Sequence, residues 1–158
     1  QGHACGFGAV PGVYWLQAIV TVAAGFVPYL PEVGEQGLAP ALADPERMLY
    51  QQWMYFAVTT VEGPAWEIGL HTRMLPEKHA VKEIVPFAWK QLRRMLRYLN
   101  KELGERDYLL ASGFSAADIM LGYLLFWFEG EFEDYSALAG YVERLRQRSA
   151  CQRALAIG

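Results

Sequence analysis

Residues 81–103 carry the clearest pattern of apolar and polar positions in the chain. Apolar residues recur there at alternating steps of three and four, which places them on one side of an α-helix. They are Val81, Val85, Ala88, Leu92, Met95, Leu99 and Leu103, with Ile84 and Leu96 widening the stripe. The sequence therefore predicts an amphipathic helix that Pro76 opens, Pro86 bends and Gly104 closes.

The opposite side of this helix is basic. The cationic residues are Lys90, Arg93, Arg94, Arg97 and Lys101. A stripe of this kind is compatible with nucleic-acid binding or with a solvated helix face. The whole chain carries a net charge of -3, and such a balance gives no general attraction to nucleic acid. We interpret the stripe as a solvated face and expect no nucleic-acid partner.

A long helix is predicted to precede this one. Asp44-Pro45-Glu46 combines an N-cap residue, a proline suited to the first turn and an acid at the positive end of the helix dipole. The helical pattern continues through residues 50–62 and meets Gly63-Pro64. That pair is expected to kink or break the helix, which then resumes over residues 66–74.

The segment FSAADI, residues 114–119, predicts a third helix start. Ser115 stands at the N-cap and Asp118 three residues later, the spacing of a capping box, and Phe114 and Ile119 have the spacing of a hydrophobic staple. The helix that follows is apolar on all sides, which favours the middle of a bundle. We expect this core helix to run from Ser115 to about Phe128, with Ser115 and Asp118 in structural roles.

The rest of the pattern completes an all-α fold. Residues 129–134 hold four acidic side chains without a histidine, which favours a solvated turn over a metal site. Amphipathic spacing predicts a helix over residues 141–148, and Ser149 is expected to cap a last short one. No alternation typical of strands and hairpins occurs. We therefore predict a helical bundle around one core.

The beginning of the chain has a different character. Residues 1–3 have the appearance of a tag remnant, and residues 4–31 carry no charge. Pro11, Pro28 and several glycines interrupt that segment, and no Lys or Arg flanks it, which argues against a membrane span. We expect residues 4–31 to form an apolar loop and helix, residues 32–43 a linker, and residues 44–158 the helical domain.

The residue types that carry chemistry are sparse. The chain has 158 residues, and its two cysteines, Cys5 and Cys151, lie at opposite ends. That arrangement gives no disulfide framework, so we expect a cytoplasmic protein. His71 and His79 have no evident partner in the sequence, and the phosphate-binding, zinc-binding and nucleophile motifs are missing. The residues alone therefore predict no catalytic group and no metal site.

Four stretches resemble the glutathione S-transferase family. Residues 37–57 are similar to the linker and first long helix of its C-terminal helical domain. Residues 98–125 resemble the end of the second long helix, the loop and the central helix, including FSAADI, and residues 141–155 resemble the closing helices. Residues 18–32 are similar to the last helix of the thioredoxin-like domain. The resemblance implies a largely missing thioredoxin-like half, of which residues 4–31 would be a remnant.

In this family the thioredoxin-like half binds glutathione and activates its thiol. The resemblance calls for an acidic residue and a serine at the start of its last helix, where this sequence has Trp15 and Leu16. A Val10-Pro11 pair is present, but it stands too close to that helix to match the cis-proline loop. We therefore expect glutathione as a co-substrate only if a thioredoxin-like half is supplied, and no catalysis from this chain alone.

The resemblance implies that the first long helix lines a hydrophobic pocket for the electrophilic substrate. Tyr55, Thr59, Glu62 and Trp66 follow one another at helical steps and are the candidate substrate-binding residues. The same residues could instead serve packing or dimerisation. The two functional hypotheses are a transferase-like protein that binds a hydrophobic small molecule and a non-catalytic binding or dimerisation module. The family resemblance, with the apolar segment Leu16–Phe26, also implies a homodimer.

Overall fold

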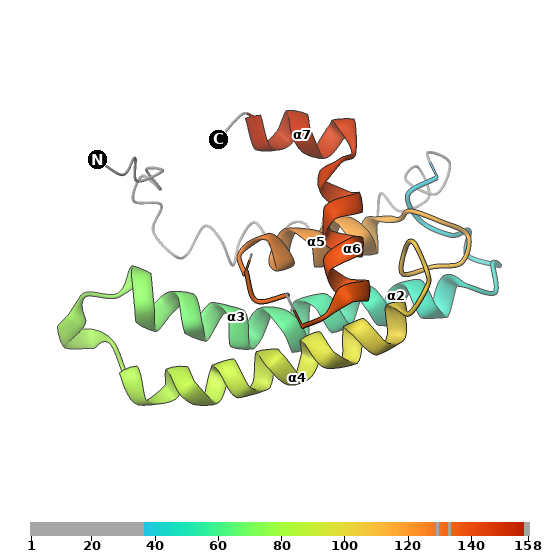
Figure 1. Ribbon diagram of the computed structural model, residues 1–158. Helices are drawn as coiled ribbons and strands as arrows, with labels where there is room; N and C mark the ends of the chain where they lie inside the picture. Colours follow the sequence, from blue (N-terminus) through green and yellow to red (C-terminus); the bar gives the residue numbers. More distant parts are fainter. Residues whose placement is uncertain (1–36, 129, 133, 157–158) are drawn as a thin grey trace.

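Two long antiparallel helical rods form one side of the molecule (Figure 1). The first contains α2 (Arg47–Tyr55) and α3 (Glu62–Gly69), and the second is α4 (Val85–Leu103). The computed structural model describes residues 37–128, 130–132 and 134–156. The expected tag, the apolar segment 4–31 and most of the linker lie outside these residues. Their assignments therefore stay predictions, as does the homodimer argument drawn from residues 16–26.

The first rod does not break at Gly63-Pro64. A π-helical segment, Phe56–Val61, connects α2 to α3, and the amide of Glu62 donates to the carbonyl of Ala57. Pro64 then falls in the first turn of α3, where a missing amide hydrogen is best tolerated. The predicted break is wrong, because helical structure continues through the pair, and the predicted kink stays a prediction. A second π-helical segment, Leu70–Met74, ends the rod.

Pro86 begins α4 and does not bend it. Residues 75–84 form a connection with two short 3₁₀ turns, Glu77–His79 and Lys82–Ile84, so no helix opens at Pro76. Pro86 occupies the first turn of α4. Gly104 closes the helix as predicted, with a positive φ of 52°. The predicted apolar stripe is confirmed for the positions buried in α4, which are Ala88, Leu92, Leu96, Leu99 and Leu103.

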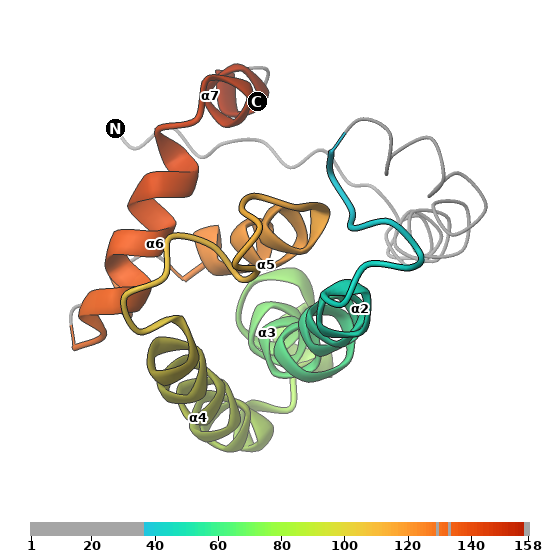
Figure 2. The same ribbon diagram turned by 90° about the vertical axis from the view of Figure 1, so that its right-hand side faces the viewer.

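The remaining helices lie beside the paired rods, and α6 crosses them (Figure 1). In both views α5 (Ala116–Phe126) lies on the side of the α2–α3 rod opposite α4 (Figures 1 and 2). α6 (Ser136–Arg146) packs against α4 and α5, and α7 (Ser149–Ala156) follows it. Gly122 allows α5 to approach α6 closely, since a Cβ there would stand 2.6 Å from Leu145 Cδ1. A larger residue at that position would require the Leu145 side chain to shift.

The end of the linker joins the start of α2 to the loop before α5. The Arg47 guanidinium donates to the carbonyl of Pro40 at 2.8 Å. The Glu46 carboxylate accepts from the amides of Ala111 and Ser112 at 2.9 and 3.0 Å. The Ser112 side chain and then the Ala111 amide, as donors to this carboxylate, lower the pKa of Glu46. Glu46 therefore fixes the loop before α5, in addition to its position at the N-terminus of α2.

The all-α prediction is confirmed for the residues that the structure describes. Their only strand-like feature is an isolated bridge between Leu110 and Gly113. One apolar core joins all the long helices, and its largest fully buried side chains include Tyr50, Ile68, Leu92, Leu121, Leu138 and Tyr141. None of the helices in this part of the chain is both long and apolar enough to cross a bilayer.

Candidate functional site

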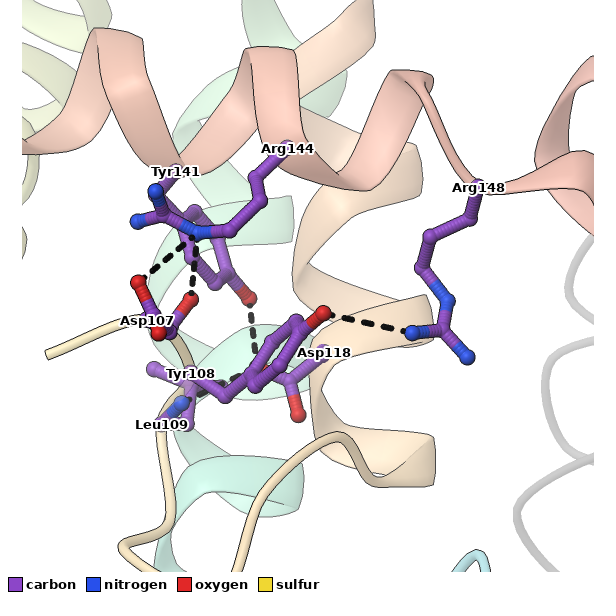
Figure 3. A network of polar contacts seen from close by, with 7 residues as sticks. All are labelled: Asp107, Tyr108, Leu109, Asp118, Tyr141, Arg144 and Arg148. Atoms are coloured by element: carbon purple, nitrogen blue, oxygen red, sulfur yellow. Dashed lines mark hydrogen bonds and ion pairs between the residues drawn. The ribbon is translucent and has the colours of Figure 1, made fainter.

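A buried carboxylate connects α5, α6 and the loop before α5 (Figure 3). Asp118 is fully buried and accepts four hydrogen bonds. Its Oδ1 accepts from the Leu109 amide at 3.0 Å and from the Tyr141 hydroxyl at 2.9 Å. Its Oδ2 accepts from the amide and the hydroxyl of Ser115 at 2.8 and 2.9 Å. These contacts tie the first turn of α5 to two other segments.

The tyrosine in this network is held in its neutral form. Tyr141 is buried, and that burial, followed by the neighbouring Asp118 carboxylate, raises the pKa of its hydroxyl well above the usual value. A neutral hydroxyl can donate to Asp118, whereas a phenolate would be repelled by it. Asp118 is thus surrounded by donors and has no route to solvent. This arrangement suits a structural role and leaves no acceptor for a substrate.

Ion pairs and aromatic contacts border this network. Arg144 pairs with Asp107 at 3.4 Å, and Arg148 donates to the Tyr108 hydroxyl at 3.2 Å (Figure 3). The Arg148 guanidinium also lies 3.4 Å from the centre of the Phe114 ring. Phe114 thus contacts α6–α7 residues, whereas Ile119 is 49% exposed. The staple between Phe114 and Ile119 stays a prediction.

One side of α5 is open to solvent. The sequence predicted an α5 that is buried all round, but Ile119 and Tyr123 are 49% and 42% exposed. Tyr123 and Trp127 stack edge to face, with ring centres 5.4 Å apart. These large apolar side chains occur one helical turn apart. The prediction of complete burial is wrong because the described helices cover α5 on its other sides only.

The four candidate residues of the first rod differ in their surroundings. Tyr55 is 69% exposed, and Thr59 is exposed, with its hydroxyl donating to the carbonyl of Tyr55 at 2.7 Å. Glu62 and Trp66 are half-buried. The segment Phe56–Val61, just before Glu62, packs against α5. Glu62 and Trp66 are therefore the more buried members of the stripe, and Tyr55 and Thr59 are the exposed ones.

Glu62 and Tyr123 both have raised pKa values. Burial raises the pKa of the Glu62 carboxyl. Burial also raises the pKa of the Tyr123 phenol, and the nearby Glu62 carboxyl adds to that rise. We define the aromatic face as Glu62 and Trp66 of α3, Ile119 and Tyr123 of α5, and Trp127 just after it. It combines large apolar side chains with a few polar groups, which is the composition of small-molecule sites.

The sequence pattern did not predict the α5 members of this face. Ile119, Tyr123 and Trp127 recur at steps of four, and that spacing was the available signal. It was hidden because the neighbouring positions on α5 are apolar as well. Only the placement of α5 over the first rod distinguishes its open side from its buried sides.

The other candidates remain apart from the aromatic face. His71 has a carboxylate partner that the sequence did not reveal, since its Nε2 lies 3.3 Å from Glu67, and its Nδ1 accepts from the Val81 amide at 3.1 Å. Cys151 is a half-buried free thiol. Among the described residues, no group of His, Cys, Asp and Glu is arranged to hold a metal ion.

The basic side of α4 is exposed, as the solvated interpretation requires. Arg93 pairs with Glu131 at 3.5 Å and stands over the Trp89 ring. Phe87 and Tyr98 are also exposed on α4. The absence of a nucleic-acid partner stays a prediction, which a binding assay over a salt series would test because phosphate contacts give a steep salt dependence.

Comparison with known proteins shows what the helical domain is similar to. Residues 76–144 match the family model of the glutathione S-transferase C-terminal domain. A search of curated protein sequences gives no match. The fold resembles that of BphK, a bacterial glutathione S-transferase solved as a ternary complex, with a TM-score of 0.72 and 26% identity. That match covers 84% of this chain and 65% of the BphK chain.

Two further solved structures are similar. A sphingomonad glutathione S-transferase complexed with glutathione is 27% identical, with a TM-score of 0.68, over 81% of this chain and 64% of its own. A glutathione transferase from Methylococcus capsulatus is 29% identical, with a TM-score of 0.65, over 82% of this chain and 63% of its own. The chain thus spans slightly less than two thirds of each of these three proteins.

Proposed function

Because this chain contains the C-terminal helical domain of the glutathione S-transferase family, we propose that it provides the wall that binds a hydrophobic ligand in a transferase-like protein. The aromatic face is the surface that would do this. The observation that carries the proposal is the open side of α5, where the rings of Tyr123 and Trp127 stack with their centres 5.4 Å apart.

The physical argument rests on exposed apolar area. Aromatic side chains contribute much of the binding energy of apolar ligands, and a ring that is already packed loses little freedom on binding. Trp127 is half-buried and holds the Tyr123 ring edge to face. Trp66 lies one turn beyond Glu62, on the same side of α3. Tyr55 and Thr59 would extend the contact toward solvent for longer ligands.

We expect Tyr123→Ala to weaken binding of a neutral hydrophobic dye such as Nile red about tenfold, since it removes an aromatic contact. Fluorescence titration of the purified chain measures this affinity. Tyr98→Ala is a matched control, because Tyr98 is exposed to a similar extent, 39% against 42%, and lies on α4, across the first rod from α5. Equal losses in the two variants would refute the assignment of the site.

Glutathione enters this proposal as a co-substrate. The sphingomonad relative was solved with glutathione bound. In the family the resemblance assigns that site to the thioredoxin-like half. We therefore propose that the helical domain contributes the hydrophobic side of the pocket and that thiol activation comes from such a half. A transferase reaction would then be addition of the glutathione thiolate to an electrophile held on the aromatic face.

A non-catalytic binding or dimerisation module is the second candidate. Trp15 and Leu16 favour it, because they stand where the resemblance calls for an acidic residue and a serine. Such a module would keep the aromatic face and bind a ligand without converting it. Only the transferase-like protein would conjugate glutathione, whereas both candidates would bind the dye. Both are consistent with a cytoplasmic protein, which the absence of a disulfide framework supports.

We also propose a homodimer, on the strength of the family resemblance. Met48 and Phe87 expose 77% and 61% of their surface, and large apolar side chains of this kind are common at interfaces between copies. Sedimentation at tens of micromolar protein is expected to show a dimer. A single monomeric species over that concentration range would contradict the proposal.

A further inference from the structure

The exposed side of α4 carries charge of one sign only. Its exposed positions are Pro86, Phe87, Lys90, Arg93, Arg94, Arg97, Tyr98 and Lys101. Five of these residues are cations and none is an acid, whereas the solvated face of a helix typically alternates the two signs. We define the basic row as the five cations, Lys90, Arg93, Arg94, Arg97 and Lys101.

The basic row is unfavourable for α4 itself. Its members recur at steps of three and four, so like charges are neighbours on the helix surface, and each such pair disfavours the helix. Within the described part of the chain, Arg93 pairs with Glu131 at 3.5 Å, and the other four cations have no acidic partner. Only Lys101 stands in the last turn, where the helix dipole stabilises a cation. Local helix energetics therefore do not account for the row.

The basic row is also a preformed surface. It belongs to one α-helix of 19 residues, Val85–Leu103, whose opposite side lies in the core. The ring of Tyr98 lies 6.3 Å from that of Trp53 and 5.4 Å from that of Phe56, centre to centre, so α4 is packed against the first rod. From Lys90 to Lys101 the row extends about 17 Å along the helix axis. A partner would meet cations that are already in position, which lowers the entropic cost of binding.

We propose that the basic row binds an acidic α-helical segment of a partner protein. Carboxylates at steps of three and four on such a segment have the same rise per residue as the row, so successive carboxylates meet successive cations. Each of the three arginines can hold a carboxylate through two parallel hydrogen bonds. The row lies on α4, across the first rod from α5, so it is separate from the open side of α5 (Figure 2).

The distribution of charge favours a short acidic segment over a nucleic acid. Without the five cations of the row, a chain of net charge -3 would carry a net charge of -8. A long polyanion would extend past the row and be repelled by this acidic remainder. A helical segment of about four turns matches the length of the row and ends with it. The same row on a second copy is excluded as the occupant, because like charges facing each other disfavour association.

The test uses an alanine-based, fluorescently labelled peptide of about 18 residues with five glutamates at alternating steps of three and four. A control peptide has the same composition, with its glutamates spread around the helix, and circular dichroism compares the helicity of the two. Anisotropy titration with the full chain gives both affinities. At about 50 mM salt we expect a dissociation constant of roughly 100 µM or tighter for the first peptide, and about fivefold weaker binding of the control. Affinity should fall several-fold at about 200 mM salt, because exposed ion pairs are screened.

Arg94→Gln combined with Arg97→Gln is expected to weaken binding of the first peptide about tenfold, because it removes two of the five ion pairs. Its urea midpoint should equal or exceed that of the parent, since like-charge repulsion on α4 is relieved. Arg73→Gln combined with Arg153→Gln is the matched control. Those two arginines are exposed and lie outside α4, and their replacement should change the affinity less than about twofold. Equal losses in the two double variants would show a response to net charge alone and overturn the proposal.

The other occupants give different results. Tighter binding of a single-stranded DNA of about 15 nucleotides than of the acidic peptide would assign the row to phosphates and overturn the proposal. A dimer of the parent that becomes a monomer in the variant of Arg94 and Arg97 would assign the row to a second copy, and would also overturn it. Absence of peptide binding at about 50 mM salt would do the same. Nile red binding on α5 is independent of all these outcomes, so the inference can fail while the proposed function stands.

Discussion

Asp118→Ala is expected to lower the free energy of unfolding by about 4 kcal/mol, several times the loss of about 1 kcal/mol expected for Ser115→Ala. From the sequence, the two substitutions are expected to cost about the same, because each removes one half of a capping box. The structure separates them. Asp118 also accepts hydrogen bonds from the Leu109 amide and the Tyr141 hydroxyl, and its removal leaves buried donors without partners.

Urea unfolding, monitored by circular dichroism, measures these losses in the free energy of unfolding. Tyr141→Phe is the matched control, because it deletes one of the four donors and preserves the packing of the ring, and it should cost about 1 to 2 kcal/mol. The expected order of unfolding midpoints is the parent, then Ser115→Ala and Tyr141→Phe, then Asp118→Ala. A midpoint for Asp118→Ala equal to that of Ser115→Ala would show that the bonds to Leu109 and Tyr141 contribute nothing to stability.

The chain of 158 residues is expected to show no glutathione conjugation above the rate in buffer. Thiol activation needs a positioned donor for the thiolate and a cradle for the tripeptide. Leu16 stands where the resemblance calls for the serine of that cradle. The aromatic face of the helical domain provides apolar contacts and one carboxylate, and a carboxylate disfavours a nearby thiolate.

Two assays on one preparation test this expectation: calorimetric titration with glutathione and conjugation of a chlorinated nitroaromatic. Nile red binding in the same preparation serves as the control that the helical domain is folded and competent. Millimolar or tighter glutathione affinity together with turnover above the buffer rate would contradict it. That outcome would also remove the argument for a non-catalytic module and assign a glutathione site to this chain.

Much of the fold was predictable because helix signals are local. The three-four periodicity identified α4, and Gly104 ended it at the predicted residue. Two of the errors concern prolines, and a third is the start of α6, which lies at Ser136 and not at residue 141. Pro64 lies inside a continuous rod and Pro86 at a helix start, and each outcome depends on the backbone in the preceding turn. That backbone conformation is π-helical before Pro64 and 3₁₀ before Pro86, which a pattern of residue types does not specify.

The site was less predictable than the fold. Helical spacing found Glu62 and Trp66 on the first rod, and their role in ligand binding stays a prediction. The α5 residues were missed because a helix that is apolar on all sides gives no signal for its open side. Tyr141 was missed as a partner of Asp118 because the contact joins residues 23 apart in the sequence. Both features arise from the packing of helices on one another.

The central claim is that the ligand binds on the open side of α5 beside Glu62, and amide chemical-shift mapping tests it most directly. The isotope-labelled protein is titrated with naphthalene methanol, a neutral aromatic alcohol. The account predicts that the largest shifts fall on residues 119–127 and 59–66, with little change along the exposed side of α4 over residues 87–101. Shifts concentrated on α4, or spread evenly over the helices, would contradict it.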